Sequence, residues 1–216
     1  MGVALPRILE ADCYCPDRRV VEEAVRTIRA GGIVVAPTDT LYGLLADPFN
    51  PRAVERVYRV KKRSRDKPLP ILLGESHHAI LLVRPSSIFW RLALRFWPGP
   101  VTIVEEARPG LPSHLERWGP MGVRLPDCPL TREIIRRSGG ALIGTSANIS
   151  GGKGPVTVYD ANEQLGDLVD LYIDAGPTRL GRPSTVVSVV GGSVEVLREG
   201  AVRREQIVGA LADEDG

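Results

Sequence analysis

Positive charge is concentrated in one short stretch of this sequence, between residues 52 and 67. The stretch contains eight lysines and arginines but two acidic residues, Glu55 and Asp66. Cations at the C-terminal end of a helix interact favourably with the helix dipole and can simply face water. Alternatively, Lys61-x-Arg63 followed by Lys67 could bind different oxygens of one polyphosphate. Both interpretations stay open, and in both we expect Lys61 and Arg63 to be exposed.

A second candidate site is a segment rich in glycine and small polar side chains, residues 144–154. It follows an apolar run at 141–143 and includes Ser146 and Asn148. Glycine lets a ligand approach the backbone, where hydroxyl and amide groups can bind its polar atoms. The segment lacks the glycine spacing of a P-loop, because Lys153 is followed by Gly154-Pro155. An ordinary glycine-rich turn remains equally consistent with this pattern.

Arg124 is a third candidate because it lies in an apolar run, Met121 to Leu125. A guanidinium that leaves a core strand needs an anionic partner, which can be a structural carboxylate or a ligand. Two hydroxyl-rich segments, Thr38-Asp39-Thr40 and Ser184-Thr185, could join the same site or could only cap turns. The sequence alone does not decide between these alternatives.

The remaining residues argue against several classes of protein. The three cysteines and three histidines show no metal-ligand spacing and no catalytic triad. The odd number of cysteines, Cys13, Cys15 and Cys128, predicts free, reduced thiols. No apolar run approaches the ~20 residues that span a bilayer, which predicts a cytoplasmic protein without membrane contact. The net charge of +2 does not by itself indicate a nucleic-acid-binding protein.

Apolar periodicity and turn residues predict the elements that must position these side chains. A helix is expected over residues 17–30, where Asp17 can cap the first turn and two glycines follow the last. A second helix should begin at Asn50-Pro51 and end near Lys62. Further helices are expected at about 86–97 and 129–138. Strands are expected at 33–36, 69–73, 101–105, 121–125, 141–143, 171–174 and 185–190, with a hairpin at Gly191-Gly192.

Alternating helices and strands followed by a hairpin predict an α/β fold with a mixed, twisted sheet. The chain of 216 residues is 43% hydrophobic and 25% charged, which is enough apolar material for a self-sufficient core. No repeat or low-complexity linker divides it. We therefore expect a single domain over residues 1–216, with a core from about 17 to 210 and a short acidic tail at Asp213 to Asp215.

Six short motifs follow one another along the chain. They are Pro37-Thr38-Asp39-Thr40-Leu41-Tyr42-Gly43-Leu44, Lys61-x-Arg63 with Lys67-Pro68-Leu69, Trp97-Pro98-Gly99-Pro100-Val101-Thr102, Val123-Arg124-Leu125-Pro126, Ser146-Ala147-Asn148-x-Ser150-Gly151, and Ser184-Thr185-Val186-Val187. Their combination resembles the YrdC-type threonylcarbamoyl-adenylate synthase family in its single-domain form. The resemblance extends over nearly the whole chain. Leu72 stands where longer members have a histidine that contacts threonine.

The resemblance implies an open, twisted α/β sheet with flanking helices and a basic concave face. It implies the synthesis of threonylcarbamoyl-AMP and pyrophosphate from L-threonine, bicarbonate and ATP, with Mg²⁺ accompanying the triphosphate. The residues carried over by position are Lys61, Arg63, Ser146 and Asn148 for catalysis, Arg63, Lys67, Ser146, Asn148 and Arg198 for ATP, and Thr40, Arg124, Gly144 and Ser184 for threonine. The product would pass to downstream enzymes that make threonylcarbamoyladenosine in tRNA.

Two other functions remain open. Relatives of this type have been associated with double-stranded RNA and ribosome assembly, and a basic concave face would also contact RNA through phosphates and shape. A carbamoyl-transfer module of the hydrogenase-maturation type would need companion zinc-finger and acylphosphatase regions, which these 216 residues do not contain. Ser146-x-Asn148 together with Lys61-x-Arg63 favours the synthase, because shape recognition of RNA would not require that pair of motifs.

Overall fold

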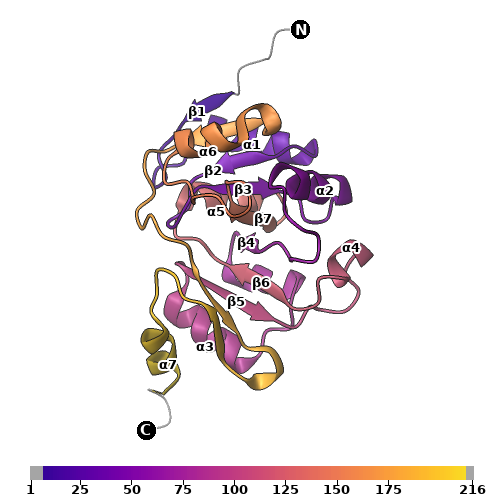
Figure 1. Cartoon of the computed structure of the whole chain (residues 1–216), viewed down its shortest axis with the longest axis vertical. Coiled ribbons are helices and arrows are strands. Elements are labelled where there is room, and N and C mark those ends of the chain that lie inside the picture. Colours follow the sequence, from indigo (N-terminus) through magenta and orange to yellow (C-terminus); the bar gives the residue numbers. More distant parts are fainter. Residues whose placement is uncertain (1–6, 213–216) are drawn as a thin grey trace.

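A large twisted sheet with helices on both faces forms the body of the protein in the computed structural model, which describes residues 7–212 (Figure 1). The strands are β1 (Ile8–Glu10), β2 (Val34–Ala36), β3 (Gly43–Ala46), β4 (Ile71–Leu73), β5 (Val101–Glu105), β6 (Met121–Arg124), β7 (Ala141–Ser146), β8 (Leu171–Asp174), β9 (Thr185–Ser188) and β10 (Glu195–Arg198). The α-helices are α1 (Arg18–Arg29), α2 (Pro51–Val60), α3 (Ser87–Phe96), α4 (Ser113–Glu116), α5 (Pro129–Arg137), α6 (Val158–Leu165) and α7 (Arg204–Ala212). The expected acidic tail, Asp213 to Asp215, lies outside the described residues.

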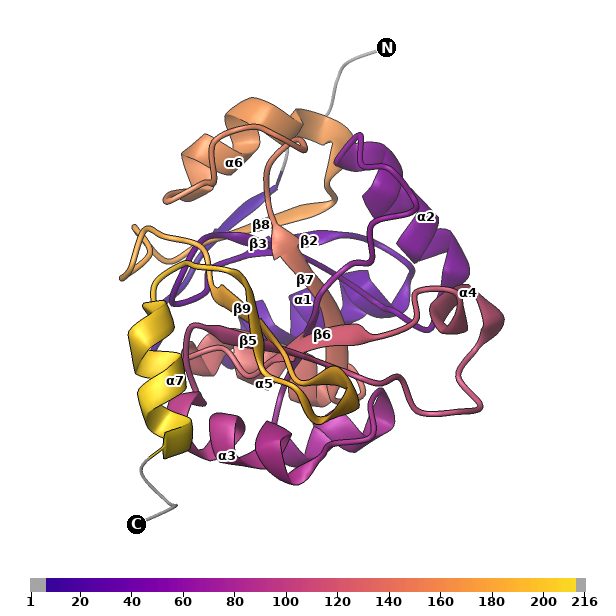
Figure 2. The same cartoon turned by 60° about the horizontal axis from the view of Figure 1, so that its bottom comes forward.

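The strands are hydrogen-bonded in the order β1-β8-β2-β3-β7-β4-β6-β5-β9-β10. Parallel pairs such as β4 with β6 occur beside antiparallel pairs such as β4 with β7, so the sheet is mixed, as the sequence predicts. In the view of Figure 2, β7 crosses the middle of the molecule between α6 and α3. Within residues 7–212, no helix combines the length and the apolar character needed to cross a membrane.

The two helices predicted most specifically begin where their capping residues place them. The Asp17 side chain accepts a hydrogen bond from the backbone N–H of Arg19 at the start of α1. Asn50 accepts from the N–H groups of Arg52 and Ala53, and Pro51 occupies the first helical position of α2. Because these side chains satisfy N–H groups that lack a partner inside the helix, they fix where each helix begins. The helix α2 ends at Val60, with Lys61 as its C-cap, close to the predicted end.

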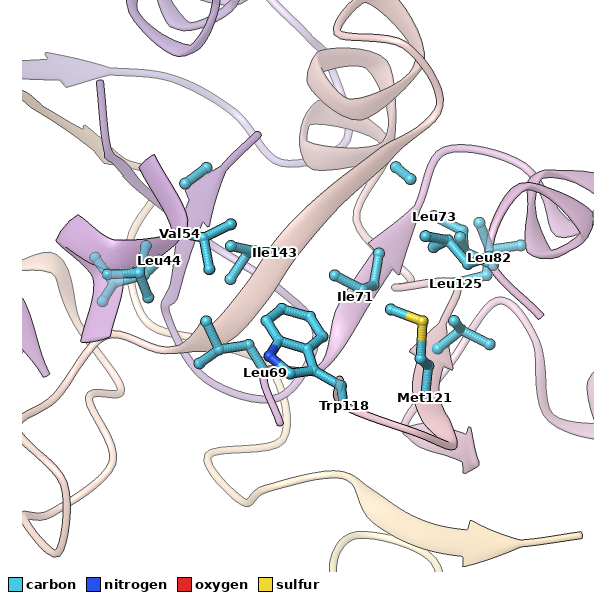
Figure 3. Packing of buried hydrophobic residues seen from close by; sticks show 14 of the residues in the cluster. Leu44, Val54, Leu69, Ile71, Leu73, Leu82, Trp118, Met121, Leu125 and Ile143 are labelled. Atoms are coloured by element: carbon cyan, nitrogen blue, oxygen red, sulfur yellow. The ribbon is translucent and has the colours of Figure 1, made fainter. Parts of the chain in front are cut away.

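Central strands such as β2, β3 and β4 are buried on both faces of the sheet, which explains why they are almost continuously apolar. On one face, Leu45, Leu72 and Leu142 pack with the buried residues of α1 and α5. On the other face, a larger cluster includes residues of α2, α3 and α6 together with Leu69 and Trp118, which lie beside each other in Figure 3. The sheet is therefore held between two layers of side chains, and its strand ends are fixed relative to one another.

Several elements are not anticipated by the sequence pattern, and one of them shapes the site. The strand β3 follows the Thr38–Tyr42 loop directly and pairs with β7, with Gly43 opposite Ser146 and Leu45 opposite Gly144. Residues 144–146 therefore belong to the strand, and the prediction that β7 ends at Ile143 is wrong. The elements β1, α6 and α7 are also absent from the sequence-based prediction.

The prediction of three free thiols is wrong for two of them. Cys13 and Cys128 form a disulfide with their Cα atoms 5.6 Å apart, whereas Cys15 is free and exposed. The bridge joins residues that are 115 positions apart and ties the segment before α1 to the start of α5. Spacing in the sequence carries no information on such a pair, because the fold alone brings the two side chains within bonding distance.

Candidate functional site

A cavity of about 170 Å³ lies on the sheet face that also carries the α1 and α5 core. In the strand ladder, Leu72 is opposite both Leu142 and Arg124. Residues opposite each other on neighbouring strands point to the same side of a sheet, so these three side chains share a face. Leu142 and Leu72 belong to the core under the two helices, while Leu72 and Arg124 also line the cavity. The cavity thus begins where the helical cover of this face ends.

Seven of the ten residues singled out from the sequence line this one cavity. They are Thr40, Arg63, Arg124, Gly144, Ser146, Ser184 and Arg198. These residues are spread over more than 150 positions of the chain, and the strands β6, β7 and β10 together with three connecting segments bring them together. The three candidate segments of the sequence, the cationic stretch, the glycine-rich segment and Arg124, therefore meet in a single site.

Arg124 is held by three partners within the protein. Its Nε donates to the carbonyl of Gly99 at 3.0 Å, Nη1 donates to Thr40 Oγ1 at 2.9 Å, and Nη2 donates to the carboxylate of Asp39. Arg124 is 5% exposed. Of the two alternatives left open by the sequence, the structure shows the structural carboxylate. A guanidinium has five N–H donors, so two of them remain for another acceptor.

The hydrogen bonds of the Thr38 and Thr40 hydroxyl groups determine which of the two donates to the other. Thr38 Oγ1 donates its single proton to the carbonyl of Leu41 at 2.6 Å. The contact of 2.9 Å between Thr38 Oγ1 and Thr40 Oγ1 must therefore have Thr40 as its donor. Since Thr40 Oγ1 also accepts from Arg124, the hydroxyl offers a further ligand only an acceptor lone pair.

The cavity lining contains a second hydroxyl pair. Thr102 Oγ1 and Ser184 Oγ lie 2.9 Å apart, and both residues are buried. Arg198 Nη2 donates to the carbonyl of Ser184 at 2.7 Å, which ties β10 to this wall. Thr102 is a cavity residue that the sequence reasoning did not select, although it ends one of the quoted motifs. It lies on β5, which pairs with the Arg124 strand β6 through Ile103 opposite Val123, and this neighbourhood is visible only in the fold.

Gly144 must be a glycine because Leu72 packs directly against it. A Cβ atom on Gly144 would lie 2.0 Å from Leu72 Cγ, well inside van der Waals contact. Leu72 therefore supplies an apolar wall to a cavity that also has polar and cationic lining residues. Any ligand in contact with this wall would be recognised there by shape and apolar contact, not by hydrogen bonding.

The cavity is strongly electropositive. Three arginines, Arg63, Arg124 and Arg198, line the cavity. None of the described lining residues is an aspartate or a glutamate. Burial lowers the pKa of Arg198, and the positive charges of Arg124 and Arg63 lower it further. Burial is also the main cause of the lowered pKa of Arg63. These shifts show that the cations are partly desolvated and repel one another, so an anion bound among them would be stabilised.

Lys61 and Asn148 lie behind the cavity wall and do not line it. Lys61 is 2% exposed, which contradicts the expectation of an exposed cation. Its Nζ donates to the backbone carbonyls of Ser146 and Asn148, and burial, with a smaller effect of Arg63, lowers the pKa of Lys61 to about 7. Asn148 Nδ2 donates to the carbonyls of Ile149 at 2.8 Å and Gly152 at 2.9 Å. Both side chains thus shape the segment that follows β7.

Arg63 and Lys67 differ in burial and in their place relative to the cavity. The Arg63 guanidinium is partly buried and donates to the carbonyls of Lys67 at 3.2 Å and Pro68 at 2.9 Å, so it also closes the turn between α2 and β4. The Lys67 side chain is exposed and does not line the cavity. Among the residues that the structure describes, no group of three or more His, Cys, Asp or Glu side chains is arranged to hold a metal ion.

Comparisons with known proteins identify relatives of this chain. The Sua5/YciO/YrdC family model, described as "Telomere recombination", matches residues 26–200. A Mycobacterium tuberculosis protein is 39% identical over 204 residues, which cover 93% of this chain and 94% of the relative. The threonylcarbamoyl-AMP synthase of Bacillus subtilis is 33% identical over 190 residues, which cover 87% of this chain and 55% of that enzyme.

A solved structure shares the fold over almost the entire chain. The crystal structure of Pyrococcus abyssi Sua5 complexed with L-threonine superposes with a TM-score of 0.88 at 28% identity, covering 97% of this chain and 61% of that one. This chain spans about three fifths of the Sua5 chain and about half of the B. subtilis enzyme, but nearly all of the M. tuberculosis relative. The family model and the relatives lead to one conclusion: the chain belongs to the Sua5/YciO/YrdC family.

Proposed function

We propose that this protein is a threonylcarbamoyl-AMP synthase, which forms threonylcarbamoyl-AMP and pyrophosphate from L-threonine, bicarbonate and ATP. The observation that carries the proposal is the cavity, in which three guanidinium groups and several hydroxyl groups converge without a carboxylate in the described lining. Such a site suits two anionic substrates that must meet. The names of the B. subtilis relative and the threonine-bound Sua5 structure support the same reaction.

Threonine would occupy the part of the cavity that contains Arg124, Thr40 and Ser184. At about 170 Å³ the cavity is smaller than the roughly 300–1,000 Å³ of sites for drug-sized ligands, so it suits a compact ligand such as an amino acid. The two free N–H donors of Arg124 match a carboxylate, because a planar guanidinium can bind both of its oxygens. Thr40 would accept a hydrogen bond from the substrate, and Ser184 with the Gly144 backbone would complete the site.

ATP would extend outward from the cavity along its cationic rim. Arg63, Arg198 and Ser146, which line the cavity, would contact phosphate oxygens, while the exposed Lys67 could reach only the part of the nucleotide that lies beyond the cavity. Mg²⁺ enters as part of the MgATP substrate. This ion commonly keeps several waters and binds through phosphates with few protein ligands, which suits a site with no described cluster of metal-binding side chains.

The chemical step needs positioning and charge stabilisation from the protein. The amino nitrogen of threonine and bicarbonate first give a carbamate and water. A carbamate oxygen then attacks the α-phosphorus of ATP as the bond to the pyrophosphate leaving group breaks. Negative charge is already dense around that phosphorus, so Arg63 and Arg198 would lower the barrier by stabilising the charge that develops. Holding both substrates in one cavity makes the attack effectively unimolecular.

A role in tRNA modification is the biological context that this reaction implies, in the cytoplasm and with transfer of the product to downstream enzymes. RNA binding without synthase activity remains the alternative function. A cavity of about 170 Å³ with a wall formed by Leu72 on Gly144 favours a small substrate over a nucleic-acid backbone, which needs an extended surface.

The proposal is tested by incubating the protein with threonine, bicarbonate and MgATP, and by identifying the adenylate by mass spectrometry. With ¹³C-bicarbonate, the adenylate should gain one mass unit, because the carbamate carbon comes from bicarbonate.

A parallel reaction with serine measures side-chain selectivity, and one with excess tRNA detects competition for the cationic rim. A protein that binds double-stranded RNA but forms no adenylate would support the alternative function instead.

A further inference from the structure

We infer that Asp39 is a positioning residue for threonine recognition, because its buried carboxylate fixes the orientation of the Arg124 guanidinium. The inference rests on the proposed function, since it assigns the carboxylate of threonine to Arg124. Asp39 does not itself line the cavity. It acts behind the cavity wall, on the residue that would touch the substrate.

The contacts of Asp39 leave it little freedom. Its side chain is fully buried, and Oδ1 accepts from Arg124 Nη2 and from the backbone N–H of Asp127 at 3.1 Å. The carbonyl of Asp39 accepts from the N–H of Leu180 at 2.9 Å. Oδ2 is also buried and has no hydrogen-bond partner among the described residues. Among the cavity cations, the Asp39 carboxylate therefore contacts Arg124 alone.

This arrangement separates the roles of the three cavity arginines. The charge of Asp39 balances that of Arg124, so Arg124 contributes oriented N–H donors more than net charge. Arg63 and Arg198, in contrast, have no carboxylate partner among the ion pairs of the described residues. A free arginine side chain has considerable rotamer entropy, which a fixed ion pair has already removed before substrate binds. The two remaining N–H donors are then held ready for the carboxylate of an amino acid.

The inference predicts an effect confined to threonine. In Asp39→Asn the volume is kept, but the charge that orients Arg124 is lost. We expect the KM for threonine in pyrophosphate release to rise at least tenfold, with the KM for ATP changed less than twofold. Because Asp39→Asn leaves Arg124 positively charged, phosphate binding should not weaken. Calorimetric titration with threonine, done without ATP, should show a matching loss of affinity.

Asp170→Asn is the matched control. Asp170 also forms an ion pair with an arginine, in this case through both of its oxygens, with Arg56 Nη1 at 2.6 Å and Nη2 at 2.9 Å, and it also accepts from a backbone N–H, that of Ile33. It lies outside the cavity lining. The variant therefore disrupts an arginine ion pair outside the cavity, and we expect both KM values to stay within twofold of the wild type.

The outcomes separate this inference from the proposed function. A folded Asp39→Asn protein with an unchanged KM for threonine would overturn the inference, and so would an equal rise in both KM values, which indicates general loosening. If Asp39→Asn does not fold, Asp39→Ser keeps an acceptor for the Asp127 N–H and carries the same prediction. A wild type that binds threonine but releases no pyrophosphate refutes the proposed function alone, and the calorimetric comparison still decides the role of Asp39. A wild type that binds no threonine overturns both.

Discussion

Lys61 Nζ donates a hydrogen bond of 2.8 Å to the backbone carbonyl of Asn148, and the backbone N–H of Ser150 returns one of 2.8 Å to the carbonyl of Lys61. The end of α2 is therefore joined to the segment after β7 by both side chain and backbone. Arg63, two residues further on, reaches the cavity from the same turn. Lys61 thus links the cationic stretch to the glycine-rich segment, and its proposed catalytic role is indirect.

The burial of Lys61 predicts a dependence of stability on pH. Its pKa is about 7 in the folded protein against 10.5 for the ordinary side chain. Between these two values the unfolded chain holds a proton that the folded chain has released, so the free energy of unfolding rises with pH, by at most about 1.4 kcal/mol per pH unit. Below pH 7 both states are protonated, and the dependence due to Lys61 disappears.

Urea unfolding at pH 6.5 and pH 9 measures this effect. The Lys61→Met variant lacks the contribution of Lys61 to the pH dependence of the free energy of unfolding. As the pH rises, the free energy of unfolding of the wild type should therefore increase relative to that of the variant. Lys62→Met is the matched control, because Lys62 is the exposed neighbour. Identical pH dependence in the wild type and Lys61→Met would show that Lys61 keeps an ordinary pKa.

Arg63→Ala should weaken nucleotide binding while the fold survives. A charge-assisted hydrogen bond contributes about 1.5–3 kcal/mol, which corresponds to a loss of affinity of roughly 10- to 100-fold. Arg65→Ala is the control, since Arg65 is exposed, pairs with Glu55 and lies outside the cavity. Calorimetry with a non-hydrolysable ATP analogue compares the two. Equal affinities in both variants would assign the cationic stretch to a solvated face or to RNA contact.

The hydrogen bond between Arg124 and Thr40 predicts a graded series of threonine affinities. Thr40→Ser keeps the hydroxyl and should bind threonine nearly as well as the wild type. Thr40→Val keeps the volume but removes an acceptor from a buried guanidinium, at a cost of about 1–3 kcal/mol. Arg124→Lys replaces the planar fork by a point charge and should lose threonine while keeping ATP. Wild-type threonine binding in both Thr40→Val and Arg124→Lys would place the amino-acid site elsewhere on the sheet.

The disulfide predicts a count of reactive thiols. Under native, non-reducing conditions an alkylating reagent should modify Cys15 alone, and reduction should release Cys13 and Cys128 as well. Because the bridge closes a loop of more than 100 residues, reduction should lower the free energy of unfolding by about 2–4 kcal/mol. Mass spectrometry of the intact alkylated protein gives the count. Three modified cysteines in the freshly purified, unreduced protein would show that the bridge does not form.

The sequence predicts the main helices well, because capping residues and apolar stripes are local signals. Asp17 and Asn50 begin α1 and α2 where the pattern places them. The strand β3 escapes prediction because Gly43–Ala46 is short and follows a polar loop, and it becomes a strand only through pairing with β2 and β7. Its omission explains why Gly144 to Ser146 were expected in a loop.

The sequence predicts which residues belong to the candidate site better than it predicts what each of them does. Charge counting treats Lys61, Lys67 and Arg63 alike, yet the first is buried, the second is exposed and the third lines the cavity. Position in the sequence cannot distinguish these cases, because each depends on which side of the α2 turn faces the sheet. Asp39 was part of a quoted motif, but its ion pair with Arg124 joins residues 85 positions apart and needs the fold to be seen.

Bicarbonate dependence of pyrophosphate release tests the proposed reaction most directly. An enzyme that activates the carboxylate of an amino acid would turn over with threonine and ATP alone, whereas a carbamate nucleophile requires bicarbonate. In degassed buffer kept under CO₂-free gas, we predict that release falls to the background of a reaction without threonine, and that added bicarbonate restores it with saturation. The full rate of threonine-dependent release in bicarbonate-free buffer would contradict the proposed reaction.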